Sequence, residues 1–226
     1  MITMATGVAA ASLSVSPVRL RVAGSSGRTI TITNAGSSAA AVDARPASVV
    51  FDRRGRPTIG PVRRDGGGWL RLRPRRLVVP AGTTAVLTVT AVAPKSAAPG
   101  DHSALVLLTT RSSRSAAIAV RLRIGVVVFV RIAGRIVHRL ELGSLRAHGR
   151  VLEAALANRG NVAERPRVRI SLSRRGHVLA RLHSPKRTLL PHSRAIERFR
   201  SPARVRGWVT ALIEAGAVSK TVRIRL

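Results

Sequence analysis

The residues able to do chemistry are few and scattered in this sequence. The segment Gly100-Asp101-His102-Ser103 places three residue types of a catalytic triad in a row. Successive side chains of a strand point to opposite faces, so these three side chains cannot relay a proton among themselves. A Pro-Gly-Asp turn that opens a strand explains the segment better.

The sequence contains no clear set of residues for metal binding or for acid–base catalysis. The six histidines form no helical metal-binding motif, and the loose pair His177 and His183 is better explained as two solvated positions. The nine carboxylates show no close pair, the absence of cysteine removes thiolate chemistry, and Gly66-Gly67-Gly68 lacks the Lys-Ser/Thr of a phosphate-binding loop. We therefore expect no enzyme, metal, cofactor or small-molecule substrate.

Charge is the most pronounced property of the chain, with a net charge of +31 from 40 basic and nine acidic residues. Only three of the basic residues are lysines, and the arginines run from end to end, as in the product of a GC-rich coding sequence. Many stand at alternate positions in apolar runs, such as Arg71 and Arg73, which puts them on the solvent face of a strand. This pattern favours solvated sheet faces over one nucleic-acid-binding patch, and non-specific adhesion to anionic polymers at low salt is expected.

Alternation of apolar and polar residues dominates the sequence. It is clear in Val18–Val22, Ile30–Ile32, Leu70–Leu72, Leu152–Leu156 and Val168–Leu172, and it predicts short, half-buried strands. Gly-, Pro- and Asn-rich turns separate the strands. The sequence therefore predicts an all-β protein of two tandem immunoglobulin-like antiparallel β-sandwiches.

The two halves of the chain share sequence markers. Thr31–Gly36 aligns with Ala155–Gly160, and Val79–Thr83 aligns with Leu190–Arg194. The first half is longer between the markers, which fits the loop from Phe51 to Gly68. These markers predict one sandwich over residues 12–124 and a second over residues 125–226.

The ends of the chain and its apolar runs bear on location. Residues 1–11 are small and apolar, and Val8–Ser12 fits a signal-peptidase site, so this segment resembles the end of an export signal. The longest apolar run, Ile124–Val130, is far shorter than a membrane helix. We expect an extracellular or cell-envelope protein without a transmembrane span.

Several segments together resemble a bacterial protein family. They are Ser16-Pro17 with Val18-Arg19-Leu20, Thr31-Ile32-Thr33-Asn34, Trp69 to Pro74, Val79 to Thr83, and Val92-Ala93-Pro94 leading to Asp101. These segments look like the bacterial cell-surface proteins of the WxL-interacting type, whose N-terminal immunoglobulin-like domain is itself similar to that of periplasmic pilus-assembly chaperones. The stretch Ile124–Gly134 looks like the strand that connects the two domains in that family. Its members usually end in a membrane helix and a basic tail, whereas this sequence ends at Val222–Leu226, so an anchor of that type is not expected.

Three features are candidates for binding a ligand or partner. The loop Phe51–Trp69 could grip an anionic polymer, although a solvated loop is favoured. The tryptophans Trp69 and Trp208 lie in or next to apolar runs, and core or interdomain packing is favoured over ligand stacking. The run Ile118–Ile132 either connects the domains or offers an edge for strand addition with a partner. The candidate residues are Arg53, Arg54, Arg56, Arg63, Arg64, Trp69, Ile118, Val120, Leu122 and Ile124.

Three hypotheses for function follow. The leading one is a non-enzymatic, exported cell-envelope protein that binds another surface protein or a cell-wall polymer through its immunoglobulin-like domains. The second is a basic protein that binds nucleic acid or another polyanion, which the dispersed arginines and the five aromatic residues disfavour. The third is a pilus-type periplasmic chaperone that uses strand addition.

Overall fold

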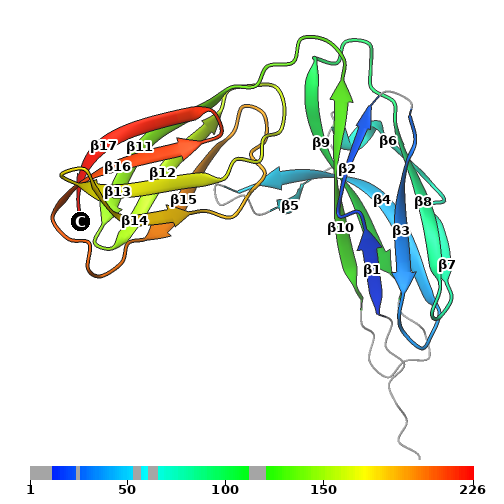
Figure 1. Cartoon of the computed structure of the whole chain (residues 1–226). Coiled ribbons are helices and arrows are strands. Elements are labelled where there is room, and N and C mark those ends of the chain that lie inside the picture. The colour runs from blue at the N-terminus through cyan, green and yellow to red at the C-terminus, as the bar shows by residue number, and fades with distance from the viewer. Residues whose placement is uncertain (1–11, 24–25, 53–56, 61–65, 112–120) are drawn as a thin grey trace, which may run out of the picture. The chain divides into compact units, whose positions relative to one another are not determined.

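The protein was analysed as a computed structural model, which describes residues 12–23, 26–52, 57–60, 66–111 and 121–226. The chain divides into two compact units (Figure 1). Unit 1 comprises Met1–Val49, Ile59–Ala98 and His102–Ile132, and unit 2 comprises Val50–Thr58, Pro99–Asp101 and Ala133–Leu226. The described residues form strands and one short 3₁₀ turn, Gly66–Trp69, and none of their helices is long and apolar enough to cross a membrane.

Unit 1 is a sandwich of two sheets. The first sheet has the order β1 (Leu13–Ser16), β3 (Arg28–Asn34), β8 (Thr84–Ala91) and β6 (Leu70–Arg73). The second has the order β2 (Arg19–Ala23), β10 (Arg123–Ile132), β9 (Gly100–Thr110), β4 (Ala40–Phe51) and β5 (Pro57–Gly60), with β7 (Arg76–Val79) also paired to β4. Pairing in the first sheet is antiparallel, whereas β10 and β2 run parallel.

The core of unit 1 follows from the alternation in its strands. In β2, Leu20 and Val22 are buried while Arg19 and Arg21 are exposed, and β6 repeats this arrangement. Aliphatic side chains from both sheets meet in one cluster, of which Ile30, Ile32, Leu70 and Leu87 are the largest fully buried members. Burial of this face gives the sandwich its main stabilisation. The expectation that strand arginines occupy solvent faces is confirmed at these positions.

Unit 2 is a second sandwich with its own core. One sheet has the order β11 (Leu140–His148), β12 (Val151–Asn158) and β15 (Arg194–Arg200). The other has the order β14 (His177–His183), β13 (Val168–Arg174), β16 (Trp208–Ala215) and β17 (Val218–Arg225). The core includes Leu152, Ile170, Leu172 and Ile213. The two separate cores confirm the prediction of immunoglobulin-like β-sandwiches.

The division between the units follows β10. Sequence alternation suggested a change of sandwich after Ile124, but β10 continues to Ile132 and pairs with β2 up to Arg131. Val126, Val128 and Val130 are buried in the core of unit 1. The strand therefore belongs to unit 1, and unit 2 resumes at Ala133.

Candidate partner-binding edge

The structure describes three of the ten candidate residues. Leu122 directly precedes β10, Ile124 is the second residue of β10, and Trp69 ends the 3₁₀ turn. The other seven, Arg53, Arg54, Arg56, Arg63, Arg64, Ile118 and Val120, lie outside the described residues. The hypothesis of a basic arm in the loop Phe51–Trp69 stays a prediction.

The two tryptophans occupy different environments. The side chain of Trp69 belongs to the core of unit 1, with the residue 7% exposed, and its ring centroid lies 4.7 Å from that of His102. The packing expectation is confirmed for Trp69. Trp208 is 54% exposed, so core packing is wrong for Trp208. An apolar run could not separate the two cases, because Trp208 is the first residue of its strand and faces away from the core that holds Val209.

An open backbone edge lies at the beginning of β10. The carbonyl of Leu122 accepts a hydrogen bond from the Thr110 N–H at 3.0 Å, on the β9 side, whereas the Val127 N–H donates to Val18 at 3.1 Å, on the β2 side. Because alternate residues direct their backbone groups to the same side, those of Arg123 and Gly125 face the β2 side. The described register with β2 begins only at Val127, so no β2 residue lies opposite these two.

The aliphatic side chains of the same strand become more exposed toward its beginning. Val126 is fully buried, Ile124 is partly buried against the core, and Leu122 is 37% exposed. Ile124 and Leu122 line a narrow apolar crevice with Leu13 and Val15 of β1. Toward its beginning, the strand therefore carries apolar side chains that its own sandwich covers less and less. An exposed edge with such a face is suited to pairing with another strand.

The sequence pattern identified only one side of this crevice. Leu13 and Val15 were expected as ordinary strand residues, and their alternation alone does not show that β1 and β2 belong to different sheets. β1 and β2 are separated at Ser16 and Pro17, after which the chain crosses from the first sheet to the second. A short edge strand followed by Pro is the signal that could have indicated the opening.

Charge near this edge comes from the exposed Arg121 and Arg123 and from one carboxylate. Oδ1 of Asp43, on β4, lies 3.6 Å from Nε of Arg111 and 3.8 Å from Nε of Arg76. These separations are those of ion pairs rather than of short hydrogen bonds. Among the described residues, no group of three or more His, Asp or Glu side chains could hold a metal ion. The geometry at β10 thus supports recognition through backbone and apolar contacts.

Comparison with solved structures finds fimbrial chaperones. The class 5 fimbriae chaperone CfaA matches with a TM-score of 0.56 and 11% sequence identity, over 95% of this chain and 98% of that chain. The chaperone YadV matches with a TM-score of 0.56 and 11% identity, over 95% and 99% of the two chains. A chain from the complex of the Salmonella enterica SafA pilin with the SafB chaperone matches with a TM-score of 0.54 and 11% identity, over 98% and 99%.

These likenesses concern the fold. No family model matches the chain, and no curated protein matches it significantly. The structural matches do not support the expected resemblance to WxL-interacting proteins, whereas they agree with the expected similarity to pilus-assembly chaperones. Over nearly its whole length, the chain has the fold of the fimbrial chaperones.

Proposed function

We propose that this chain is a non-enzymatic, exported chaperone of the cell envelope that holds a surface-protein subunit by β-strand addition at the beginning of β10. The open edge beside Arg123 and Gly125 carries the proposal, since a partner strand there would hydrogen-bond to their backbone groups. The partly exposed side chains of Leu122 and Ile124 would supply apolar contact. Ile118 and Val120 continue the same alternation in the sequence, and we predict that they also contact the partner strand.

The similarity in fold supports this choice over the leading hypothesis from the sequence. The matched structures include a pilin with its chaperone and a chaperone with a tip adhesin subunit. Like the leading hypothesis, this proposal expects an exported protein with a protein partner. It differs in that the principal ligand is a protein subunit and not a cell-wall polymer. The polyanion hypothesis stays a prediction.

Co-expression with the surface proteins encoded by neighbouring genes tests the proposal. We expect one of them to co-purify with the chain in equal amounts and to stay bound in high salt, because apolar and backbone contacts are weakly screened by salt. Leu122→Asp should lower the yield of this complex by about tenfold or more, since it places a charge in an apolar contact.

Val86→Asp is the matched control. Val86 is a 52% exposed aliphatic residue on β8, away from the open edge, and this variant should leave the yield unchanged. Circular dichroism would verify that both variants fold. Equal complex formation by Leu122→Asp and the unsubstituted chain would contradict the proposed site, and a complex that dissociates in moderate salt would favour the polyanion hypothesis.

A further inference from the structure

One end of unit 2 brings together the turns of both sheets. The start of β12 pairs with the end of β15, with Val151 opposite Arg200, and the start of β16 pairs with the end of β17, with Trp208 opposite Arg225. Ser201 donates to the Arg150 carbonyl at 2.8 Å, and Leu226 donates to the Gly207 carbonyl at 3.0 Å. Residues far apart in the sequence thus meet at the end marked C in Figure 1.

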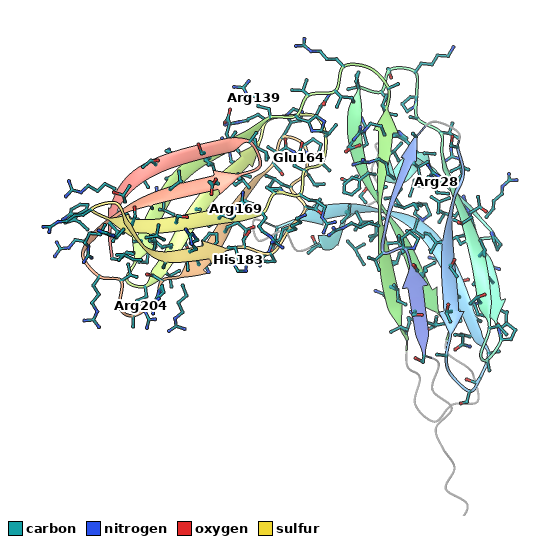
Figure 2. All side chains as sticks on the ribbon, in the orientation of Figure 1. Arg28, Arg139, Glu164, Arg169, His183 and Arg204 are labelled. Atoms are coloured by element: carbon teal, nitrogen blue, oxygen red, sulfur yellow. The ribbon has the colours of Figure 1, made fainter. Side chains whose placement is uncertain are left out.

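Exposed arginines concentrate at this end. We define the basic end of unit 2 by Arg150, Arg174, Arg204, Arg206, Arg223 and Arg225, all of which are exposed. Arg204 projects from the loop between β15 and β16 (Figure 2). Within the described part of the chain, none of the six arginines forms an ion pair with a carboxylate.

The hydrogen bonds of these arginines go to backbone carbonyls. Nε of Arg150 donates to Ser201 at 3.1 Å, and Nε of Arg206 donates to Ala203 at 3.3 Å. The guanidinium of Arg174 donates to the carbonyls of Trp208 and Arg206. A carbonyl orients a guanidinium without neutralising it. The basic end therefore holds several positioned positive charges that remain available to an anion.

Trp208 gives the same end an apolar anchor. Its ring lies under Arg223, whose guanidinium carbon is 5.3 Å from the ring centroid, and more than half of the residue is exposed. The next residue, Val209, is 2% exposed and fixes the start of the strand in the core. A fixed, exposed tryptophan surrounded by arginines has the composition of a membrane-interface anchor, because indole partitions to the headgroup region while guanidinium groups bind lipid phosphates.

We propose that the basic end of unit 2 docks on a membrane surface rich in anionic phospholipids, with Trp208 inserted at the headgroup level. The end is built from turns and strand ends of both sheets, an arrangement that suits contact with a flat surface. Sequence-tolerant strand binding uses several aromatic stacking positions, and this end supplies one. Docking here does not depend on strand addition at β10.

Tryptophan fluorescence provides a direct test, because the chain has one buried and one exposed tryptophan. With vesicles of equal parts phosphatidylglycerol and phosphatidylcholine, the emission should shift to shorter wavelength, and brominated acyl chains should quench it. Trp208→Phe should abolish both changes, since Trp69 stays in the core of unit 1. Binding without quenching by brominated lipid would overturn the proposal.

Matched pairs of arginines separate specific docking from general adhesion. Arg223→Gln with Arg225→Gln should weaken vesicle binding by roughly fivefold per arginine removed. Arg71→Gln with Arg73→Gln removes the same charge from an exposed Arg-Leu-Arg strand of unit 1 and should have a much smaller effect. Equal losses in the two variants would overturn the assignment. The same blue shift of Trp208 with duplex DNA or polyphosphate as with vesicles would also overturn it, in favour of a polyanion site.

Discussion

Units 1 and 2 each contain a buried asparagine that makes the same kind of hydrogen bonds. In unit 1, the side-chain nitrogen of Asn34 donates to Ser38 at 2.7 Å and to Val79 at 3.0 Å, and its oxygen accepts from the Gly36 N–H at 3.0 Å. In unit 2, Asn158 donates to Val162 at 2.7 Å and to Leu189 at 3.2 Å, and accepts from Gly160 at 2.9 Å. Both residues are fully buried. The markers aligned in the sequence thus perform one structural task in both sandwiches.

The units differ in how they compensate their charge. Unit 1 has two acidic residues in its sequence ranges, Asp43 and Asp65, whereas unit 2 has seven. In unit 2, glutamates pair with arginines: Glu153 pairs with Arg198 of the adjacent strand at 2.7 Å, and Glu141 pairs with Arg159, just after β12, at 2.9 Å. The hydrogen bonds inside the turns are therefore common to both sandwiches, whereas the number of acidic residues differs between them.

Removal of the asparagine should have the largest effect. Asn34→Ala and Asn158→Ala should each destabilise their own unit by about 3 kcal/mol, because each leaves several buried backbone groups without a partner. Hydrogen exchange of peptides from each unit would measure the two effects separately. Thr84→Ala, at an exposed strand position, should change stability little. A large loss in only one unit would break the equivalence of the two turns.

A smaller effect is expected at Glu197, a carboxyl group inside unit 2. Glu197 is 6% exposed and lies opposite Ala154, on the face of β15 that contains Phe199. Burial raises the pKa of Glu197, and the positive charge of Arg187 partly opposes the rise. Because the pKa in the folded state exceeds that in the unfolded state, the contribution of Glu197 to stability is greatest below the ordinary value of 4.5 and is lost as the pH rises through the folded value.

Glu197→Gln should remove this pH dependence and stabilise unit 2 by about 1 kcal/mol at neutral pH, because an amide avoids the burial of a charge. Thermal unfolding from pH 4 to pH 8 would measure both changes, with Glu214→Gln, at a more exposed carboxyl group of unit 2, as the control. If the pH dependence of stability were the same in Glu197→Gln as in the unsubstituted chain, Glu197 would not be the source of a pH dependence particular to unit 2.

The smallest effect is expected at Glu141, where the pKa moves in the opposite direction. The hydrogen bond from Arg159 lowers the pKa of Glu141, with further help from the charge of Arg139. Its contribution to stability is therefore present above the ordinary pKa and is lost as the pH falls through the folded value. Since the pair is solvated, the change in stability should be slight.

Nuclear magnetic resonance can measure this pKa directly, because the chain contains only five glutamates. In Arg159→Gln, the pKa of Glu141 should rise toward its ordinary value, whereas the distant Arg204→Gln should not move it. A pKa that stays low in Arg159→Gln would assign the shift to other arginines of the sheet.

Much of the fold could be predicted because strand alternation is a local property. Leu70 and Leu72 are buried between exposed Arg71 and Arg73, as the pattern indicates. The Asn-x-Gly markers were also predictable, since the asparagine oxygen and the glycine N–H that it binds are two residues apart. The equivalence of the two halves could therefore be inferred before either turn was seen.

The candidate site could be predicted only in part. The aliphatic alternation that ends at Leu122 and Ile124 indicated a strand available to a partner, but the length of the open edge depends on where β2 stops pairing. That limit results from tertiary structure. The exposure of Trp208 was missed for a similar reason, because hydropathy shows which residues are apolar and not which end of a strand remains uncovered.

The parallel pairing of β2 with β10 has a consequence for the order of folding. Arg19 is opposite Val127, more than a hundred residues later in the chain, so β2 cannot complete its sheet until almost all of unit 1 has been synthesised. Contacts between such distant residues slow folding, and they leave the early strand with an unpaired edge during that interval. β10, the last strand of unit 1 to be synthesised, is thus the strand that pairs with β2. A chain halted before residue 127 would lack a complete sandwich.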